Sequence, residues 1–135
     1  MLFQYYPSVA HNYKFELNKD IHLASAHFNP HESAGKSRNM HGHTFIVNIT
    51  IGGNELADSG FLVNFGTINE MVYDKFDSTV LNDHPEFSET FPTTEGIAQT
   101  LFHMIDKELE ALPNKPKLLQ VLVRENPSSY VAYRG

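Results

Sequence analysis

The chain has 135 residues, of which 41% are hydrophobic and 12% aromatic, and this composition suits one compact domain spanning residues 1–135. Its 16 acidic residues outnumber its 10 basic residues, and the net charge of -6 argues against nucleic acid as a partner. The start lacks the pattern of a signal peptide, and no apolar run reaches about 18 residues, so we expect a soluble, cytoplasmic protein without membrane contact.

The N-terminal half predicts two strands separated by a loop. Residues 15–27 have the composition of a strand, with a possible turn at residues 18–20 that would divide it. Residues 30–39 are mostly polar or turn-forming, so we expect an irregular surface loop. Residues 41–51 alternate in character, which predicts a strand with one buried face. That face carries His41, His43, Phe45, Val47, Ile49 and Ile51, and the opposite face carries Thr44, Asn48 and Thr50.

Two helices are predicted in the middle of the chain, after Gly52-Gly53-Asn54 ends the second strand. The first helix follows a predicted cap at Asn64 and has apolar residues at spacings of three and four. The second runs from about residue 94 to 112, with Thr93 as its N-cap and Pro113 as its end. The apolar positions are Phe65, Ile68, Val72 and Phe76 in the first helix, and Ile97, Leu101, Ile105, Leu109 and Leu112 in the second.

Two further strands are predicted near the C-terminus, at residues 117–125 and 130–134, with Pro127-Ser128-Ser129 between them. Period-two alternation places Leu119, Val121, Val123 and Glu125 on one face of the first of these strands. The order of elements is therefore ββααββ. This order indicates an α+β domain with two helices on one face of an antiparallel sheet.

Histidines are the natural candidates for metal ligands, because the chain has eight of them and no cysteine. His41 and His43 lie on the same side of one strand, so both imidazoles could reach one ion. His27, at the end of a neighbouring strand, could supply a third ligand and leave one position open, as in catalytic zinc sites. The alternative is that two half-buried histidines simply flank Gly42, although burying them without partners would cost on the order of several kcal/mol.

Glu125 is a second candidate, because it is in phase with Val121 and Val123 on a face that is otherwise apolar. A carboxylate there could accept two N–H bonds from a flat heterocycle with an amino group beside a ring N–H, as a pterin has. Alternatively, the strand ends at Arg124 and Glu125 faces water. Asp77 could orient a catalytic group, although short polar residues after a helix usually form turns.

Six segments spread over nearly the whole chain read FELNKDIHLASAHF, MHGHTF, GFLVNFG, LNDHPEF, FPTTE and VRENPSSYVAYRG. Together they resemble the 6-carboxytetrahydropterin / 6-pyruvoyltetrahydropterin synthase family, in particular its bacterial 6-carboxytetrahydropterin synthases. The resemblance implies the tunnelling fold, whose ββααββ order agrees with the predicted elements. It also implies a homo-oligomer of trimers stacked into hexamers, with active sites between subunits.

The resemblance also implies the roles of individual residues. His27, His41 and His43 would bind Zn²⁺, and Glu125 would anchor the pterin ring with Thr94 nearby. The implied reaction converts 7,8-dihydroneopterin triphosphate to 6-carboxytetrahydropterin with loss of acetaldehyde and triphosphate, an early step toward queuosine and other deazapurines. Zinc would bind the side-chain hydroxyls of this substrate and make them more acidic.

Two positions depart from the family pattern. The family's catalytic cysteine, four residues before the first histidine of HGH, is Ser37 here, and the family's aspartate-histidine pair is Asp77-Ser78. A serine hydroxyl is too weak an acid to replace a thiolate, and Ser78 cannot shuttle protons at neutral pH. Because loss of a general acid or base typically costs about 10²- to 10⁴-fold, we expect retained binding with severely reduced turnover.

Several alternatives remain open at this point. The paired serines fit deliberate inactivation that traps a substrate, or a paralogue that binds pterins without the family's chemistry. Another activity of the tunnelling fold would need a carboxylate base, which Ser37 is not. His31 or Glu32, in the same loop, could act as a substitute base. Lys36 and Arg38 are candidates for triphosphate binding by their charge and position.

Overall fold

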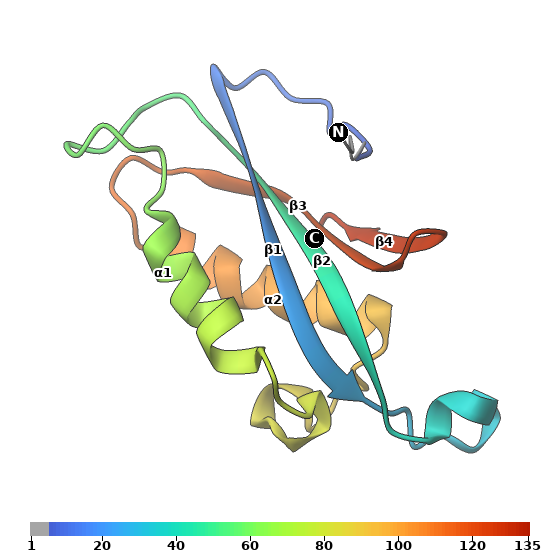
Figure 1. The fold of residues 1–135 in the computed structure, drawn as a ribbon. Helices are drawn as coiled ribbons and strands as arrows, with labels where there is room; N and C mark the ends of the chain where they lie inside the picture. Colours follow the sequence, from blue (N-terminus) through green and yellow to red (C-terminus); the bar gives the residue numbers. More distant parts are fainter. Residues whose placement is uncertain (1–5) are drawn as a thin grey trace.

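A computed structural model describes residues 6–135 as a four-stranded antiparallel sheet in the order β1-β2-β3-β4, with helices packed on one face (Figure 1). Its elements follow the predicted order, so the α+β architecture with ββααββ connectivity is confirmed. The strands are β1 (Phe15–His27), β2 (His41–Gly53), β3 (Lys117–Asn126) and β4 (Ser129–Tyr133), and the main helices are α1 (Phe65–Asn69) and α2 (Thr94–Glu110).

The first two strands form a long hairpin in which all 13 residues of β1 pair with β2. The predicted turn at residues 18–20 is wrong, because these residues pair with residues 48–50 of β2 and β1 is continuous. Asp20 accepts a hydrogen bond from Asn48, and Asn18 accepts one from Thr50, so the polar residues suggestive of a turn stabilise a strand pair instead. The pairing brings His27 directly opposite His41 at the far end of the hairpin.

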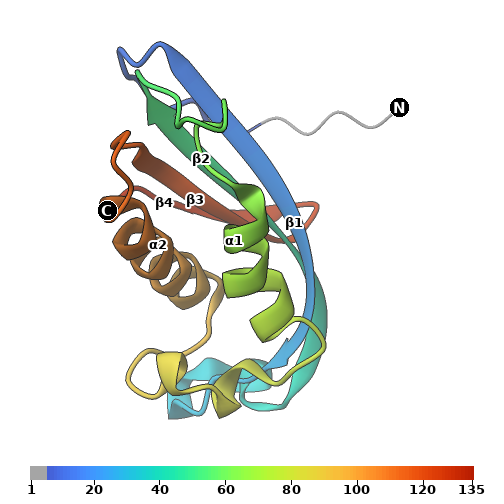
Figure 2. The ribbon, with the colours of Figure 1, turned by 90° about the vertical axis from the view of Figure 1, so that its left-hand side faces the viewer.

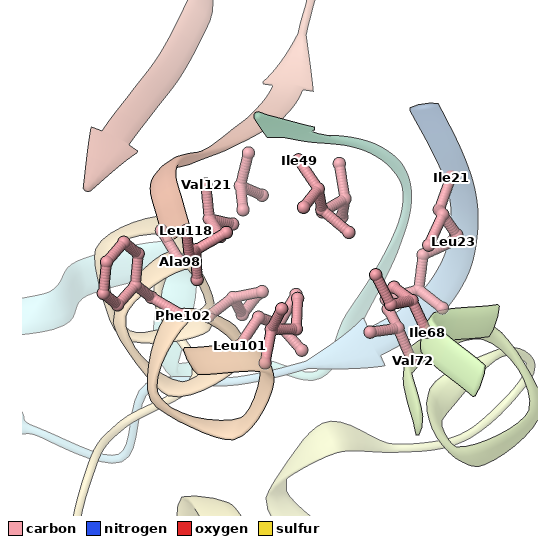
Figure 3. Packing of buried hydrophobic residues seen from close by; sticks show 14 of the residues in the cluster. Ile21, Leu23, Ile49, Ile68, Val72, Ala98, Leu101, Phe102, Leu118 and Val121 are labelled. Atoms are coloured by element: carbon pink, nitrogen blue, oxygen red, sulfur yellow. The ribbon is translucent and has the colours of Figure 1, made fainter. Parts of the chain in front are cut away.

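Both helices pack on the concave side of the curved sheet, as Figure 2 shows. Asn64 caps α1 by accepting a hydrogen bond from the Gly66 amide, and Thr93 caps α2 by accepting one from the Gly96 amide, as expected. A π-helical segment (Glu70–Asp74) continues α1. The core between sheet and helices contains the predicted stripes, and Figure 3 shows side chains of α1, α2 and the strands meeting there, including Ile68, Val72, Leu101, Ile49 and Val121.

One face assignment in β3 is wrong. Leu118 joins the core with Val121 and Val123, whereas Leu119 lies near Gly52, outside the core cluster. The reason is a β-bulge: β2 and β3 pair regularly as far as Thr50, and the register then shifts. A bulge adds one residue to a strand and reverses the faces of the residues beyond it.

Short connecting segments gather at the end of the sheet where β1 ends and β2 begins (Figure 2). The loop expected to be irregular contains a 3-10 helical segment (Glu32–Arg38), kinked at Gly35, whose positive φ of 60° is easily adopted by glycine. Two further 3-10 turns, Leu81–Asp83 and Pro85–Phe87, precede α2. Within residues 6–135, no helix is long and apolar enough to span a bilayer.

Candidate functional site

Three histidines and a glutamate meet at this end of the sheet. The ring centroids of His27 and His41 are 4.4 Å apart, and those of His41 and His43 are 4.8 Å apart. The candidate ligand atoms of these histidines and of Glu125 all lie within 4.8 Å of one another. The strand register explains this closeness, because His27 pairs with His41 across the hairpin and His43 is two residues further along β2.

Two of the three imidazoles are oriented by backbone carbonyl groups. The Nδ1 atom of His27 donates to the carbonyl oxygen of Pro92, and Nδ1 of His41 donates to that of Asn39 at 2.8 Å. With the proton on Nδ1, the Nε2 atom of each ring keeps its lone pair, which is what a metal ligand needs. Histidines that bind metals are commonly held by such second hydrogen bonds.

The environment of His27 fits a metal ligand. This side chain is buried, and its Nε2 atom has no hydrogen-bond partner among the described residues 6–135. Burial lowers the pKa of His27 below its usual value of 6.5, which outweighs the opposite effect of the Pro92 carbonyl. An unpaired buried nitrogen is costly, and a bound metal would satisfy it while requiring the neutral imidazole that burial favours.

Glu125 contacts both the histidines and the start of α2. Its Oε1 atom lies 3.1 Å from Nε2 of His43 and 4.0 Å from Nε2 of His27, and its Oε2 atom accepts a hydrogen bond from Thr94 Oγ1 at 3.3 Å. The glutamate therefore does not simply face water at a strand end. The structure brings Glu125 and Thr94 together with the histidines.

Ser37 lies beside this cluster, in a hollow of about 230 Å³ that we call the histidine hollow. The carbonyl oxygen of Ser37 accepts a hydrogen bond from the Asn29 amide at 2.8 Å, which holds the loop against the end of β1. The hollow is lined in part by His27, Ser37, His41, Thr94, Glu95 and Glu125.

Asp77 and Ser78 lie outside the histidine hollow. Ser78 lines a separate hollow of about 510 Å³, the strand-edge hollow, which shares His43 with the cluster. Asp77 accepts hydrogen bonds from the Ala24 amide at 2.9 Å and from the Ser78 hydroxyl at 3.1 Å. Ser78 has a positive φ of 60° and donates its amide to the Ala24 carbonyl. Within one chain, the two candidate catalytic regions thus face different hollows.

The remaining candidates in the loop differ in position. Lys36 and Ser37 line a shallow region beside His41 and His43. Arg38 is exposed and is not among the residues lining these hollows. His31 caps the 3-10 segment by accepting a hydrogen bond from the Ser33 amide, so its ring has a local structural partner.

Sequence reasoning missed the residues that position His27. The Asn82 side chain accepts a hydrogen bond from the Phe28 amide and donates one to the Phe28 carbonyl, which fixes the chain just after His27. The carbonyl of Pro92 orients the His27 ring itself. Their only sequence signal is membership of the segments LNDHPEF and FPTTE, because a backbone carbonyl leaves no trace in residue type.

Comparison with known proteins gives a consistent set of relatives. A profile described as 6-pyruvoyl tetrahydropterin synthase matches residues 16–135. The chain is 51% identical over 138 residues to the 6-carboxy-5,6,7,8-tetrahydropterin synthase of Bacillus subtilis, covering 99% of this chain and 94% of that protein. It is 31% identical over 106 residues to the 6-pyruvoyl tetrahydrobiopterin synthase of Dictyostelium discoideum, covering 75% of each.

Solved structures agree on the fold. The 6-pyruvoyl tetrahydropterin synthase of Caenorhabditis elegans superposes with a TM-score of 0.70 at 23% identity, covering 90% of this chain and 95% of that one. The synthase of Plasmodium falciparum gives a TM-score of 0.63 at 18% identity, covering 92% and 99%. At these identities the likeness concerns the fold, and it supports the predicted tunnelling fold.

Proposed function

The chain belongs to the 6-pyruvoyl tetrahydropterin synthase family, and we propose that it is a zinc-binding 6-carboxytetrahydropterin synthase-like protein with impaired turnover. Its ligand would be 7,8-dihydroneopterin triphosphate, on the route to queuosine and other deazapurines. This proposal extends to the chain the activity of the 51% identical synthase of Bacillus subtilis. A homo-oligomer, trimeric or hexameric, and a cytoplasmic location are parts of the same proposal.

The observation that carries the proposal is the buried Nε2 atom of His27, which has no hydrogen-bond partner within residues 6–135 and lies beside His41, His43 and Glu125. Imidazole is a common zinc ligand, and three imidazoles on one zinc ion leave a position for a substrate. Bound zinc would polarise the hydroxyl groups of the pterin side chain and lower their pKa values.

The chain's own residues would hold the ring. The carboxylate of Glu125 can accept the 2-amino group and the adjacent ring N–H of a pterin as a bidentate pair. Thr94 donates to Glu125 and limits its rotation. With the ring held there, its side chain would extend toward His27, His41 and Ser37, which line the histidine hollow.

Proton transfer is the step these residues support poorly. Ser37 stands where the family resemblance implies a cysteine base, and Ser78 where it implies a histidine. Asp77 still lies beside Ser78, but it is hydrogen-bonded to the strand edge and to the Ser78 hydroxyl. A second candidate function follows from these serines: a protein that binds pterins without converting them.

The first test is the zinc content of the purified protein together with its affinity for dihydroneopterin, by elemental analysis and calorimetry. We expect near-stoichiometric zinc and measurable pterin binding, and we expect Glu125→Ala to abolish the latter. Unchanged pterin affinity in Glu125→Ala would refute both the enzyme and the binding-protein proposals. Product analysis then separates those two, because only the enzyme releases acetaldehyde.

A further inference from the structure

The carboxylate of Glu125 lies within the histidine cluster, at a spacing suited to metal ligation. Its Oε1 atom is 3.1 Å from Nε2 of His43 and 4.0 Å from Nε2 of His27. Two ligands bound at about 2.0–2.1 Å to a tetrahedral ion lie about 3.4 Å apart. The glutamate oxygen is therefore placed like a fourth ligand beside three imidazoles.

We propose that Glu125 is the fourth metal ligand in the pterin-free protein, and that a bound pterin ring removes this carboxylate from the metal. The inference rests on the proposed function for the pterin, but the ligation itself rests on the cluster geometry alone. A closed set of four protein ligands is typical of a stable, unreactive zinc site, whereas an open position is typical of a catalytic one. Binding of the pterin ring would therefore convert a closed zinc site with four protein ligands into an open site with three.

The two roles exclude each other because they need the same oxygen. Oε2 of Glu125 accepts the hydrogen bond of Thr94 Oγ1, while Oε1 faces the histidines. A bidentate clamp on the amino group and ring N–H of a pterin requires both oxygens of the carboxylate. The ring and the metal therefore compete for Oε1.

This competition makes a pterin ring without a side chain an antagonist of metal binding. By linkage, the factor by which such a ring weakens zinc affinity equals the factor by which zinc weakens ring affinity. A substrate whose side-chain hydroxyls replace Oε1 on the metal would escape this penalty. The arrangement thus discriminates between bare pterins and pterins that carry adjacent hydroxyls.

The ligation half is tested by competing a chelator against zinc-loaded protein. We expect Glu125→Gln and Glu125→Asp to lose about tenfold or more in zinc affinity, because neither places a charged oxygen at the position of Oε1. Glu95→Gln is the matched control, since Glu95 lines the same hollow outside the cluster, and its affinity should stay within about twofold. Circular dichroism and thermal melting check that each variant is folded. Zinc affinities within twofold of the original protein in both Glu125 variants would overturn the proposal.

The exchange half is tested with cobalt(II) in place of zinc and with pterin lacking a C6 side chain. We expect the visible spectrum of the cobalt protein to change on addition of the ring, and zinc affinity to fall in parallel. An unchanged spectrum while calorimetry shows bound ring would overturn the exchange. A ring that fails to bind even the metal-free protein would overturn both the exchange and the proposed function, whereas zinc loss in the Glu125 variants would still support ligation.

Discussion

The two hollows at the end of the β1–β2 hairpin lie on either side of the histidine cluster but are built differently: His27 and His41 line one, and His43 lines the other. In the histidine hollow, His27 and His41 are oriented by backbone carbonyls, and Glu125 and Thr94 complete the arrangement. The described residues that line the strand-edge hollow form no such arrangement. Ser78, which lines it, has a hydroxyl that does not titrate near neutral pH, and the adjacent Asp77 accepts a hydrogen bond from the Ala24 amide. The histidine hollow thus carries groups suited to binding, whereas Ser78 in the strand-edge hollow offers no group that moves a proton at neutral pH.

The largest expected effect comes from changing one serine in each hollow, Ser37 in the histidine hollow and Ser78 in the strand-edge hollow. If the proposed function holds, Ser37→Cys combined with Ser78→His should raise acetaldehyde release by about 10²- to 10⁴-fold, because the two variants supply a general base and a general acid. Histidine is among the residues that tolerate the positive φ of position 78. Product formation is measured by mass spectrometry.

A control for this restoration combines Ser33→Cys with Ser78→His, which places the thiol in the same loop but outside the histidine hollow. It should stay near the original rate. If the restored protein binds zinc and pterin but releases no acetaldehyde, the lyase interpretation is wrong and the binding-protein interpretation remains.

Removal of one candidate metal ligand tests the histidine cluster. His43→Ala should lower zinc affinity by at least about 100-fold, because it removes a metal ligand itself. Loss of a residue that only hydrogen-bonds to a ligand already lowers metal affinity about 10- to 100-fold. The matched control is His22→Ala, because His22 is an exposed histidine of β1 outside the cluster. Equal zinc affinities in the two variants would show that the cluster does not bind the metal.

Much of this first hollow follows from the sequence by simple physics. The alternation of side chains along a strand predicts that His41 and His43 lie on the core side of β2. It also predicts that Glu125 lies on the same face of β3 as buried residues. Two features had no such signal. The bulge that moved Leu118 into the core is a local register event, and the carbonyl of Pro92 that orients His27 is a main-chain group. The polar residues 18–20 led to a wrong prediction of a turn, because side chains common in turns can also form hydrogen bonds across paired strands.

A smaller effect is expected at Gly96, in the first turn of α2. A Cβ atom there would meet the Phe91 carbonyl oxygen at 2.0 Å, next to the Pro92 carbonyl that orients His27. Gly96→Ala should therefore destabilise the protein by about 1–3 kcal/mol, despite alanine's better helix propensity. It should also weaken zinc binding. Urea unfolding measures the first effect, and Gln99→Ala, an exposed change on the same helix, is the control.

The smallest effect is expected at Asp77, where a substitution tests whether the carboxylate stabilises the strand edge. Asp77→Ala removes the acceptor of the Ala24 amide and should cost about 1 kcal/mol of folding free energy. Asp77→Asn keeps an acceptor oxygen and should recover most of it. If urea unfolding shows that recovery while zinc affinity stays unchanged in both variants, then Asp77 supports the strand edge. Equal stability of Asp77→Ala and the original protein would instead show that the hydrogen bond to the Ala24 amide does not stabilise the strand edge.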